Sequence, residues 1–344
     1  MRRASLPLLR IGALIASFTA PVVAQEAPPV DESPWLRREN VGYGPFSALS
    51  LSPLSSLRPG FLPVVPTSLT SGALEARVEQ SWEKVISSSD SWFFDYEVLR
   101  SNLAVSWEPV DLLRLGFEFD STERVGGGLL QHFMLAFHRA FGLKTSYITP
   151  YPAHENLIEI PAAPGRPAIL VRGNDPEPFQ SSGRLTLERE LSYGDASLPA
   201  VGAAVSLGRK VVSGDLRQGL PVDVAGSLGA SKGLGEVFLY AAADLEWFGD
   251  QSFFGLPLRA TQWSVRAAVE WHCLPGFSLT AQYLLKRGAA SRLEDFSLCS
   301  NDVSGGFTWE LAPGVRLELA LLHDLVNTYN TPDYGFHLGL ALRW

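Results

Sequence analysis

Apolar and polar residues alternate with a period of two through most of the chain from Gly72 onward. The pattern is clearest at the end, where every second residue from Phe336 to Trp344 is apolar and those between them are polar or small. Successive side chains of a β-strand point to opposite faces, so the alternation predicts strands with one apolar and one polar face. About twelve strands are predicted, at residues 73–84, 93–108, 111–121, 182–192, 199–210, 221–231, 235–248, 260–273, 276–287, 301–311, 314–325 and 334–344.

The links between these segments are sorted by length. Short links such as Leu274-Pro275 and Ala312-Pro313 alternate along the chain with longer ones, although one link on the short side, around Tyr193 to Leu198, is longer. Such sorting is typical of a transmembrane antiparallel β-barrel, with turns on the periplasmic side and loops outside. A soluble β-sandwich, the alternative fold, has no reason to sort its loops. The longer links are predicted at residues 85–92, 122–181, 211–220, 249–259, 288–300 and 326–333.

The tryptophans support the barrel. Seven lie near predicted strand ends on the apolar face, where a barrel carries its interfacial girdle, although ordinary core tryptophans would show a similar placement. The final strand also ends on an aromatic residue, which resembles the terminal signal of bacterial outer-membrane proteins. That resemblance implies outer-membrane lipid as the surroundings and the barrel assembly machinery as a partner of the strand ending in Trp344. The tryptophans are Trp82, Trp107, Trp247, Trp263, Trp271, Trp309 and Trp344.

The N-terminal region has two parts. Residues 1–24 have a basic start, an apolar stretch and the sequence Val22-Val23-Ala24, which together predict a signal peptide cleaved after Ala24. An anchored helix is the alternative, and Arg10 and Pro21 disfavour it. Residues 25–71 form a proline-rich lead-in, predicted to be partly disordered, whose later part runs in extended form along or into the barrel.

The net charge narrows the choice of partners. The whole chain carries −8, and loss of the three signal-peptide arginines with no acidic residue would leave −11. A chain this acidic repels phosphate backbones, which argues against nucleic acid as a partner. Past the signal segment no apolar run reaches 18 residues, so the sequence predicts no spanning helix.

The polar face of the predicted strands is charged and would line the lumen. Its charges are of both signs, so they do not form a ring selective for one kind of ion. Twelve strands lie between small barrels filled by side chains and wide ones that hold a water channel, so filling and conduction both stay open. The candidate lumen or mouth residues are Arg77, Arg100, Arg114, Glu118, Arg266, Glu270, Arg316, Glu318 and His337.

The longest loop, 122–181, breaks the strand pattern. Apolar residues recur at three- and four-residue spacing over 129–141, which predicts an amphipathic helix carrying Phe137, His138 and Phe141. The helix would cap the outer mouth, enter the lumen, lie at the membrane surface or pack on its own loop. Residues 157–160 and 168–171 are predicted to pair as a β-arm.

Sequence motifs give little sign of chemistry. No pair among the six histidines has a metal-ligand spacing, so neither a metal nor a cofactor is predicted, and no catalytic residue is named. His323-Asp324 and Ser300-Asn301 could be neighbours across the sheet, a weak hydrolase signal without a nucleophile elbow. The two cysteines, Cys273 and Cys299, are predicted to lie at opposite barrel ends and to be unbonded.

Several short motifs occur in a characteristic order. Gly127-Gly128-Leu129 is followed by a Phe-His-x-x-Phe-Gly-Leu element over 137–143, with Gly44-Pro45-Phe46 upstream and His337-Leu338-Gly339-Leu340 at the end. This order resembles an uncharacterised family of outer-membrane barrels, the domain-of-unknown-function 3187 family, over about 42–344. Residues 47–50 and Gln131 depart from the family pattern. The resemblance implies the fold and a bacterial outer-membrane location, and no activity.

Three functions follow from this fold. The first is a small-solute pore with the long loop as its constriction, and the second is a closed structural or surface-binding barrel. The third, an outer-membrane hydrolase, would need a serine and a histidine within hydrogen-bond reach on the outer surface.

Overall fold

The computed structural model describes the part of the chain that forms the barrel. All described residues belong to one compact unit, 34–344. They are 40–49, 51, 58, 60–67, 71–89, 92–125, 128–140, 142, 156–162, 168–172, 177–213, 222–249, 252–253, 256–291, 293–324, 330 and 332–344. The predicted signal peptide and its cleavage site lie outside these residues.

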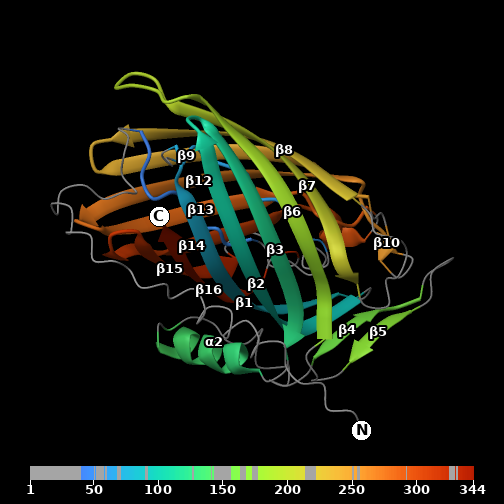
Figure 1. The fold of residues 1–344 in the computed structure, drawn as a ribbon. Helices are drawn as coiled ribbons and strands as arrows, with labels where there is room; N and C mark the ends of the chain where they lie inside the picture. Colours follow the sequence, from blue (N-terminus) through green and yellow to red (C-terminus); the bar gives the residue numbers. More distant parts are fainter. Residues whose placement is uncertain are drawn as a thin grey trace, which may run out of the picture. The chain divides into compact units, whose positions relative to one another are not determined.

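Twelve of the described strands close into one antiparallel barrel (Figure 1). Each pairs with the next in chain order, and the first pairs with the last over Glu75–Lys84 and Tyr334–Arg343, which closes the cylinder. The predicted fold class is therefore confirmed. The strands are β1 Leu74–Ser89, β2 Trp92–Val110, β3 Leu113–Val125, β6 Glu177–Ser192, β7 Ala200–Ser213, β8 Val222–Leu234, β9 Val237–Trp247, β12 Thr261–Leu274, β13 Phe277–Lys286, β14 Ser300–Ala312, β15 Val315–Asp324 and β16 Tyr334–Arg343.

Short turns gather at one end of the barrel, here called the turn end, and longer connections at the other, the loop end. At the turn end β8–β9, β12–β13 and β14–β15 are joined through Gly235, Gly276 and Gly314, whose φ angles are 68°, 70° and 78°. Glycine adopts this left-handed conformation without steric cost. In the β2–β3 turn, Leu112 adopts it instead, with φ 70°.

One predicted loop is wrong. Residues 85–92 were expected to link two strands, but β1 continues to Ser89, which pairs with Trp92 at the start of β2. The strands extend because Val85 and Trp92 turn their side chains inward and are buried in an apolar cluster. β3 and β6 likewise run further than predicted, so the loop between them spans 126–176.

The two faces of the wall are opposite to those of a soluble domain. On the outside Leu185, Val205 and Leu245 are 61%, 57% and 59% exposed, whereas the inward Arg184 and Glu246 are 5% and 2% exposed. A soluble sandwich would bury the apolar face, so this observation removes that alternative. Outward tryptophans lie at both ends: Trp107, Trp271, Trp309 and Trp344 near the turn end and Trp247 near the loop end.

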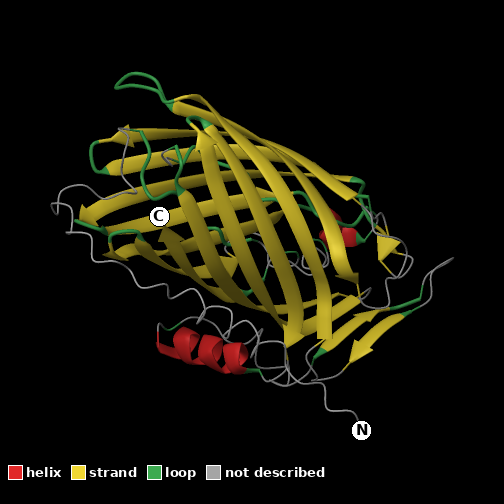
Figure 2. Ribbon diagram, viewed as in Figure 1, coloured by secondary structure: helices red, strands yellow, loops and turns green. Residues whose placement is uncertain are grey.

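The loop end carries the remaining elements (Figure 2). β4 Leu157–Ile160 pairs with β2 and with β5 Ile169–Arg172, which confirms the predicted β-arm. β10 Ser252–Phe253 pairs with β11 Leu256–Pro257, and η2 covers Glu294–Ser297. Apolar side chains from several of these elements, from β1 and β2 and from the lead-in form a cluster that we call the apolar lid. It comprises Leu51, Val85, Trp92, Phe94, Tyr96, Val98, Ile158, Ile160, Ile169, Leu256, Leu258, Ala289, Ala290, Leu293 and Phe296.

The predicted helix is α2, Leu129–Ala140, and it packs on the outside of β1 and β16 (Figure 1). The ring of Phe133 lies 4.8 Å from that of Phe336, an outward residue of β16. The Glu97 carboxylate accepts hydrogen bonds from the N–H groups of Leu130 and Gln131 at the start of the helix. Within the described residues no helix is long and apolar enough to cross a membrane.

Candidate functional site

The lumen is occupied by the lead-in, which passes through it twice. Residues 40–49 and 51, the ascending limb, run from the turn end toward the loop end. Residues 60–67, the returning limb, run back toward the turn end, where β1 begins. The lead-in thus enters the barrel, as predicted, and its two limbs lie between the charged inner faces of opposite walls.

The ascending limb is fixed at the turn end by Asn40. Its side-chain amide donates to the carbonyl oxygens of Asp195 and Leu198 in the β6–β7 turn, at 3.0 and 3.1 Å, and accepts from the N–H of Gly233. Asp195 Oδ1 in turn accepts from the Ser197 hydroxyl and from two backbone N–H groups, and these hydrogen bonds lower the pKa of Asp195. The entry point is therefore an ordered turn.

Glu270 on β12 holds the next part of this limb. Its carboxylate accepts hydrogen bonds from the N–H groups of Tyr43 and Gly44, at 3.3 and 3.1 Å, and from the Tyr240 hydroxyl at 2.6 Å. The Tyr43 ring stacks on His272 with 4.8 Å between ring centres. One buried carboxylate therefore satisfies two backbone donors that have no strand partner.

At mid-lumen the ascending limb is hydrogen-bonded to three strands of the wall. The Ser47 N–H donates to Glu318 on β15, at 3.1 Å, and the Ser47 hydroxyl donates to Glu79 on β1. The Ser47 carbonyl accepts from Arg100 on β2 at 3.4 Å. Arg266 on β12 then bridges the limbs, because its guanidinium donates to the Phe46 carbonyl and to the Pro63 carbonyl.

The returning limb is held by fewer hydrogen bonds. The N–H groups of Phe61 and Val64 donate to Glu246 and Ser227, at 3.0 and 2.8 Å. The Thr67 carbonyl accepts from Arg114 at 3.2 Å. The Val64 backbone also lies so close to Gly229 on β8 that a Cβ at that position would overlap it.

These contacts explain why the inner wall carries both charges. An extended backbone in a lumen needs acceptors for its N–H groups and donors for its carbonyls. Wall glutamates supply the acceptors and wall arginines the donors, and a hydrogen bond to an ionised side chain is stronger than one between neutral groups. The wall therefore does for the lead-in what a neighbouring strand does within a sheet.

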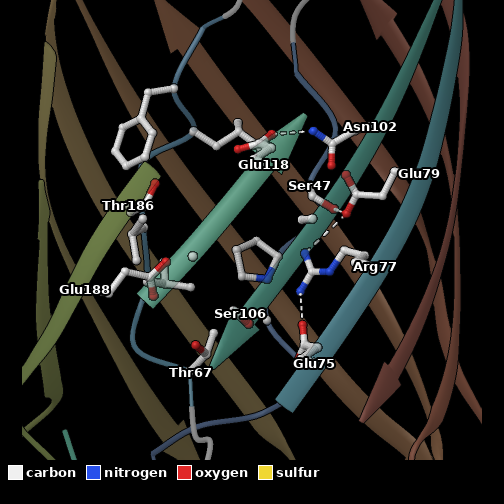
Figure 3. A pocket seen from close by; sticks show the side chains of 18 of the residues that line it. Ser47, Thr67, Glu75, Arg77, Glu79, Asn102, Ser106, Glu118, Thr186 and Glu188 are labelled. Atoms are coloured by element: carbon white, nitrogen blue, oxygen red, sulfur yellow. Dashed lines mark hydrogen bonds and ion pairs between the residues drawn. The ribbon is translucent and has the colours of Figure 1, made fainter. Parts of the chain in front are cut away.

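A cavity of about 190 Å³ remains between the limbs and the wall of β1, β2, β3 and β6 (Figure 3). The figure shows Arg77 between Glu75 and Glu79 on one side and Glu188 on another. Arg77 pairs with both glutamates, at 2.9 and 3.3 Å, and Arg114 pairs with Glu188 at 3.4 Å. The limbs contribute an apolar side that includes Phe61.

A family model covers nearly the whole barrel chain. The model described as "Protein of unknown function (DUF3187)" matches residues 32–344. The chain belongs to this family. A search of curated proteins found no match.

Solved structures similar to this DUF3187 chain include three barrels. The outer membrane channel COG4313 from Pseudomonas putida F1 is 14% identical, with a TM-score of 0.47 over 83% of this chain and 99% of that one. The Ralstonia pickettii toluene transporter TbuX is 10% identical, with a TM-score of 0.41 over 86% and 98% of the two chains. The NanC porin is 10% identical, with a TM-score of 0.43 over 78% and 98%.

The structure places all nine predicted lumen residues of this DUF3187 chain on the inner wall. Five of them, Arg100, Arg114, Arg266, Glu270 and Glu318, bond the limbs directly, as does Arg316 through the Tyr43 carbonyl at 3.0 Å. The others act through these groups: Arg77 pairs with Glu79, Glu118 with Arg100, and His337 with Glu318.

Of the predicted helix residues, Phe137 and His138 lie on α2, and Phe141 lies outside the described residues. The Phe137 ring is 6.0 Å from that of Tyr334, and the buried His138 ring is stacked 6.1 Å from that of His323. These residues hold α2 on the barrel and are remote from the lumen. No disulfide joins Cys273 to Cys299, as predicted.

Sequence reasoning missed a serine–histidine–carboxylate chain in the wall. Ser81 Oγ lies 2.9 Å from His337 Nδ1, and His337 Nε2 lies 3.1 Å from Glu318 Oε1. Ser81 and His337 are each 1% exposed, and the chain ends on the carboxylate that holds Ser47. The group therefore positions a limb anchor. The hydrolase hypothesis relied instead on His323 and Ser300, which lie on the paired strands β15 and β14.

Proposed function

We propose that this chain is a bacterial outer-membrane β-barrel that forms a small-solute pore closed at rest by its own N-terminal segment. Membrane placement is supported by the apolar outer face, by tryptophans at both ends, and by β9, β13, β15 and β16, whose lengths of 11, 10, 10 and 10 residues suit a bilayer. Loops then face outward and the turn end faces the periplasm.

The observation that carries the closed-pore proposal is the double passage of the lead-in through the lumen. A twelve-stranded barrel is wider than the eight-stranded kind that side chains just fill, and here the lead-in occupies the additional space. That segment is attached by bonds between side chains and its backbone, and not by a continuous ladder of strand pairing. It can therefore leave the wall without opening the barrel.

A second candidate is a permanently closed barrel that serves the envelope structurally. The apolar lid favours it, because Trp92, Phe94 and Phe296 are each no more than 1% exposed and their rings are packed at 4.3 to 5.8 Å. A passage for solutes would have to open this lid as well as the lumen.

A substitution that displaces the returning limb distinguishes the closed pore from the permanently closed barrel. In Gly229→Ala the added Cβ overlaps the Val64 backbone, so the returning limb must leave its place, while the outer face of β8 is untouched. Gly226→Ala on the same strand is the matched control, because its Cβ meets no atom within 4 Å. We expect Gly229→Ala to give more frequent and longer ion-current openings in planar lipid bilayers than the parent and Gly226→Ala.

Folding of each variant is checked by the heat-dependent gel mobility of the intact barrel. A folded Gly229→Ala barrel that stays electrically silent, together with a silent folded barrel that lacks residues 40–67, would favour the structural candidate over the pore.

A further inference from the structure

The cavity between the limbs and the β1, β2, β3 and β6 wall is lined by charged residues of both signs that have unmet hydrogen-bonding groups. Glu118 uses only Oε1, which accepts from Arg100 and Asn102, and its side chain remains 33% exposed. Glu188 uses only Oε2, which accepts from Arg114, and remains 23% exposed. Within the described residues each of these carboxylates therefore keeps one oxygen without a partner at the cavity.

Two guanidinium groups that line the cavity have donors without an acceptor. The Nε–H groups of Arg114 and Arg266 are buried and have no acceptor among the described residues. Arg266 is 5% exposed, and its hydrogen bonds go to the carbonyl oxygens of Phe46 and Pro63, which are neutral. A buried cation bonded only to neutral groups favours an anionic partner.

We propose that this cavity binds a small zwitterionic solute. Its carboxylate would accept from the guanidinium groups of Arg266 and Arg114. Its ammonium group would donate to the open carboxylate oxygens of Glu118 and Glu188. A singly charged solute would meet only half of these groups and would bring an uncompensated charge into the lumen.

The cavity suits such a solute in size and extends toward one end of the barrel. Its volume of about 190 Å³ compares with roughly 30 Å³ for the liquid volume of one water molecule. A smaller hollow of about 30 Å³ shares Thr67, Arg114 and Glu188 with it and reaches Leu112 in the β2–β3 turn. The cavity thus extends toward the turn end, which is the periplasmic side under the proposed function. Only this assignment of sides, and not the binding chemistry, rests on that proposal.

The test compares zwitterions with singly charged analogues. The full barrel in detergent is titrated calorimetrically with glycine, 4-aminobutyrate and 6-aminohexanoate, which vary the separation of the two charges, and with butyrate and butylamine. We expect at least one zwitterion to bind about tenfold more tightly than either analogue, which corresponds to about 1.4 kcal/mol. Equal binding of butyrate would overturn the proposal in favour of a plain anion site, and absence of binding by all probes would also overturn it.

A variant assigns the ammonium site. Glu118→Gln keeps the size of the side chain and removes its charge, so we expect it to abolish the preference for the zwitterion, while butyrate binds at least as tightly as to the parent because a like charge has been removed. Glu159→Gln, at an exposed position on β4, is the matched control and should bind as the parent does. Calorimetry needs no ion current, so a silent barrel that binds 4-aminobutyrate contradicts only the pore, and a conducting barrel that binds no probe contradicts only this site.

Discussion

Leu112 occupies a turn position where the corresponding residues of three other turns are glycine. Its φ of 70° lies in the left-handed region, which costs an L-residue about 1–2 kcal/mol. Its carbonyl accepts from the Glu190 N–H at 2.9 Å, and its own N–H donates to Glu108 at 3.2 Å. The two bonds tie the β2–β3 turn to β6 and offset the strain.

A β-branched residue tolerates this conformation less well than leucine. We therefore expect Leu112→Val to lower the free energy of unfolding by about 1 kcal/mol, and Leu112→Gly to leave it nearly unchanged, because relief of strain offsets the lost side chain and the greater freedom of the unfolded chain. Urea unfolding of the barrel in lipid vesicles measures both. Leu198→Val, in the β6–β7 turn, is the control, and an equal loss there would show that the φ angle is not the cause.

Single residues also show how much of the candidate site could be predicted from the sequence. Alternation was sufficient to place Arg266 and Glu270 on the inner wall, because side-chain direction in a strand follows from position alone. It could not show that both bond the lead-in. A proline-rich segment that is held by wall side chains shows no regular alternation in its own sequence. Only the mixed charge of the inner wall indicated that this wall faces a backbone with donors and acceptors.

At the scale of elements, the start of α2 is held by one carboxylate of the barrel. Glu97 Oε1 accepts from Leu130 N–H at 3.1 Å and Gln131 N–H at 3.4 Å, and Oε2 accepts from the Trp82 indole at 3.1 Å. The positive end of the helix dipole adds to this attachment. The sequence predicted the helix over 129–141 from its apolar spacing. It could not predict this docking, because the contact joins segments that only the closed barrel brings together.

Removal of the Glu97 charge should loosen this helix alone. We expect Glu97→Gln to weaken the start of α2 by about 1 kcal/mol, a typical value for loss of a helix cap, and to raise amide hydrogen exchange over 129–140. Exchange in β9 and β12 should not change. Glu159→Gln is the control, because it removes a carboxylate from the loop that carries α2 without touching the helix. Faster exchange of the helix in that variant would contradict the capping role of Glu97.

The elements also show which strands were hard to predict. β9 and β12 alternate cleanly because lipid-facing and lumen-facing sides differ in polarity. Where β2 passes beyond the wall, its inward side chains become apolar and pack in the apolar lid, so the alternation loses its contrast. Residues 85–92 read as a loop because the run from Ser87 to Ser91 consists of serines and one aspartate, residue types typical of turns, although 85–89 pair with 92–96 as strands.

For the whole molecule, the outward apolar face determines whether the barrel is stable in lipid or in water. Leu185 on β6 pairs across the sheet with Phe117 and Leu207, which lie on the same outer face. In water, an exposed leucine replaced by arginine changes the free energy of unfolding by no more than about 0.5 kcal/mol. In lipid, the same change near the middle of a barrel strand costs about 2–4 kcal/mol.

We therefore expect Leu185→Arg to lower the free energy of unfolding in lipid vesicles by about 2–4 kcal/mol. Leu191→Arg is the control, because Leu191 is an exposed leucine of the same strand but lies near the turn end, where the cost falls to about 0–1 kcal/mol. The difference between the two variants reports depth in a bilayer and cancels the general effect of replacing leucine by arginine. Equal effects at both positions would mean that this face meets water, and the proposed membrane location and pore would then both be wrong.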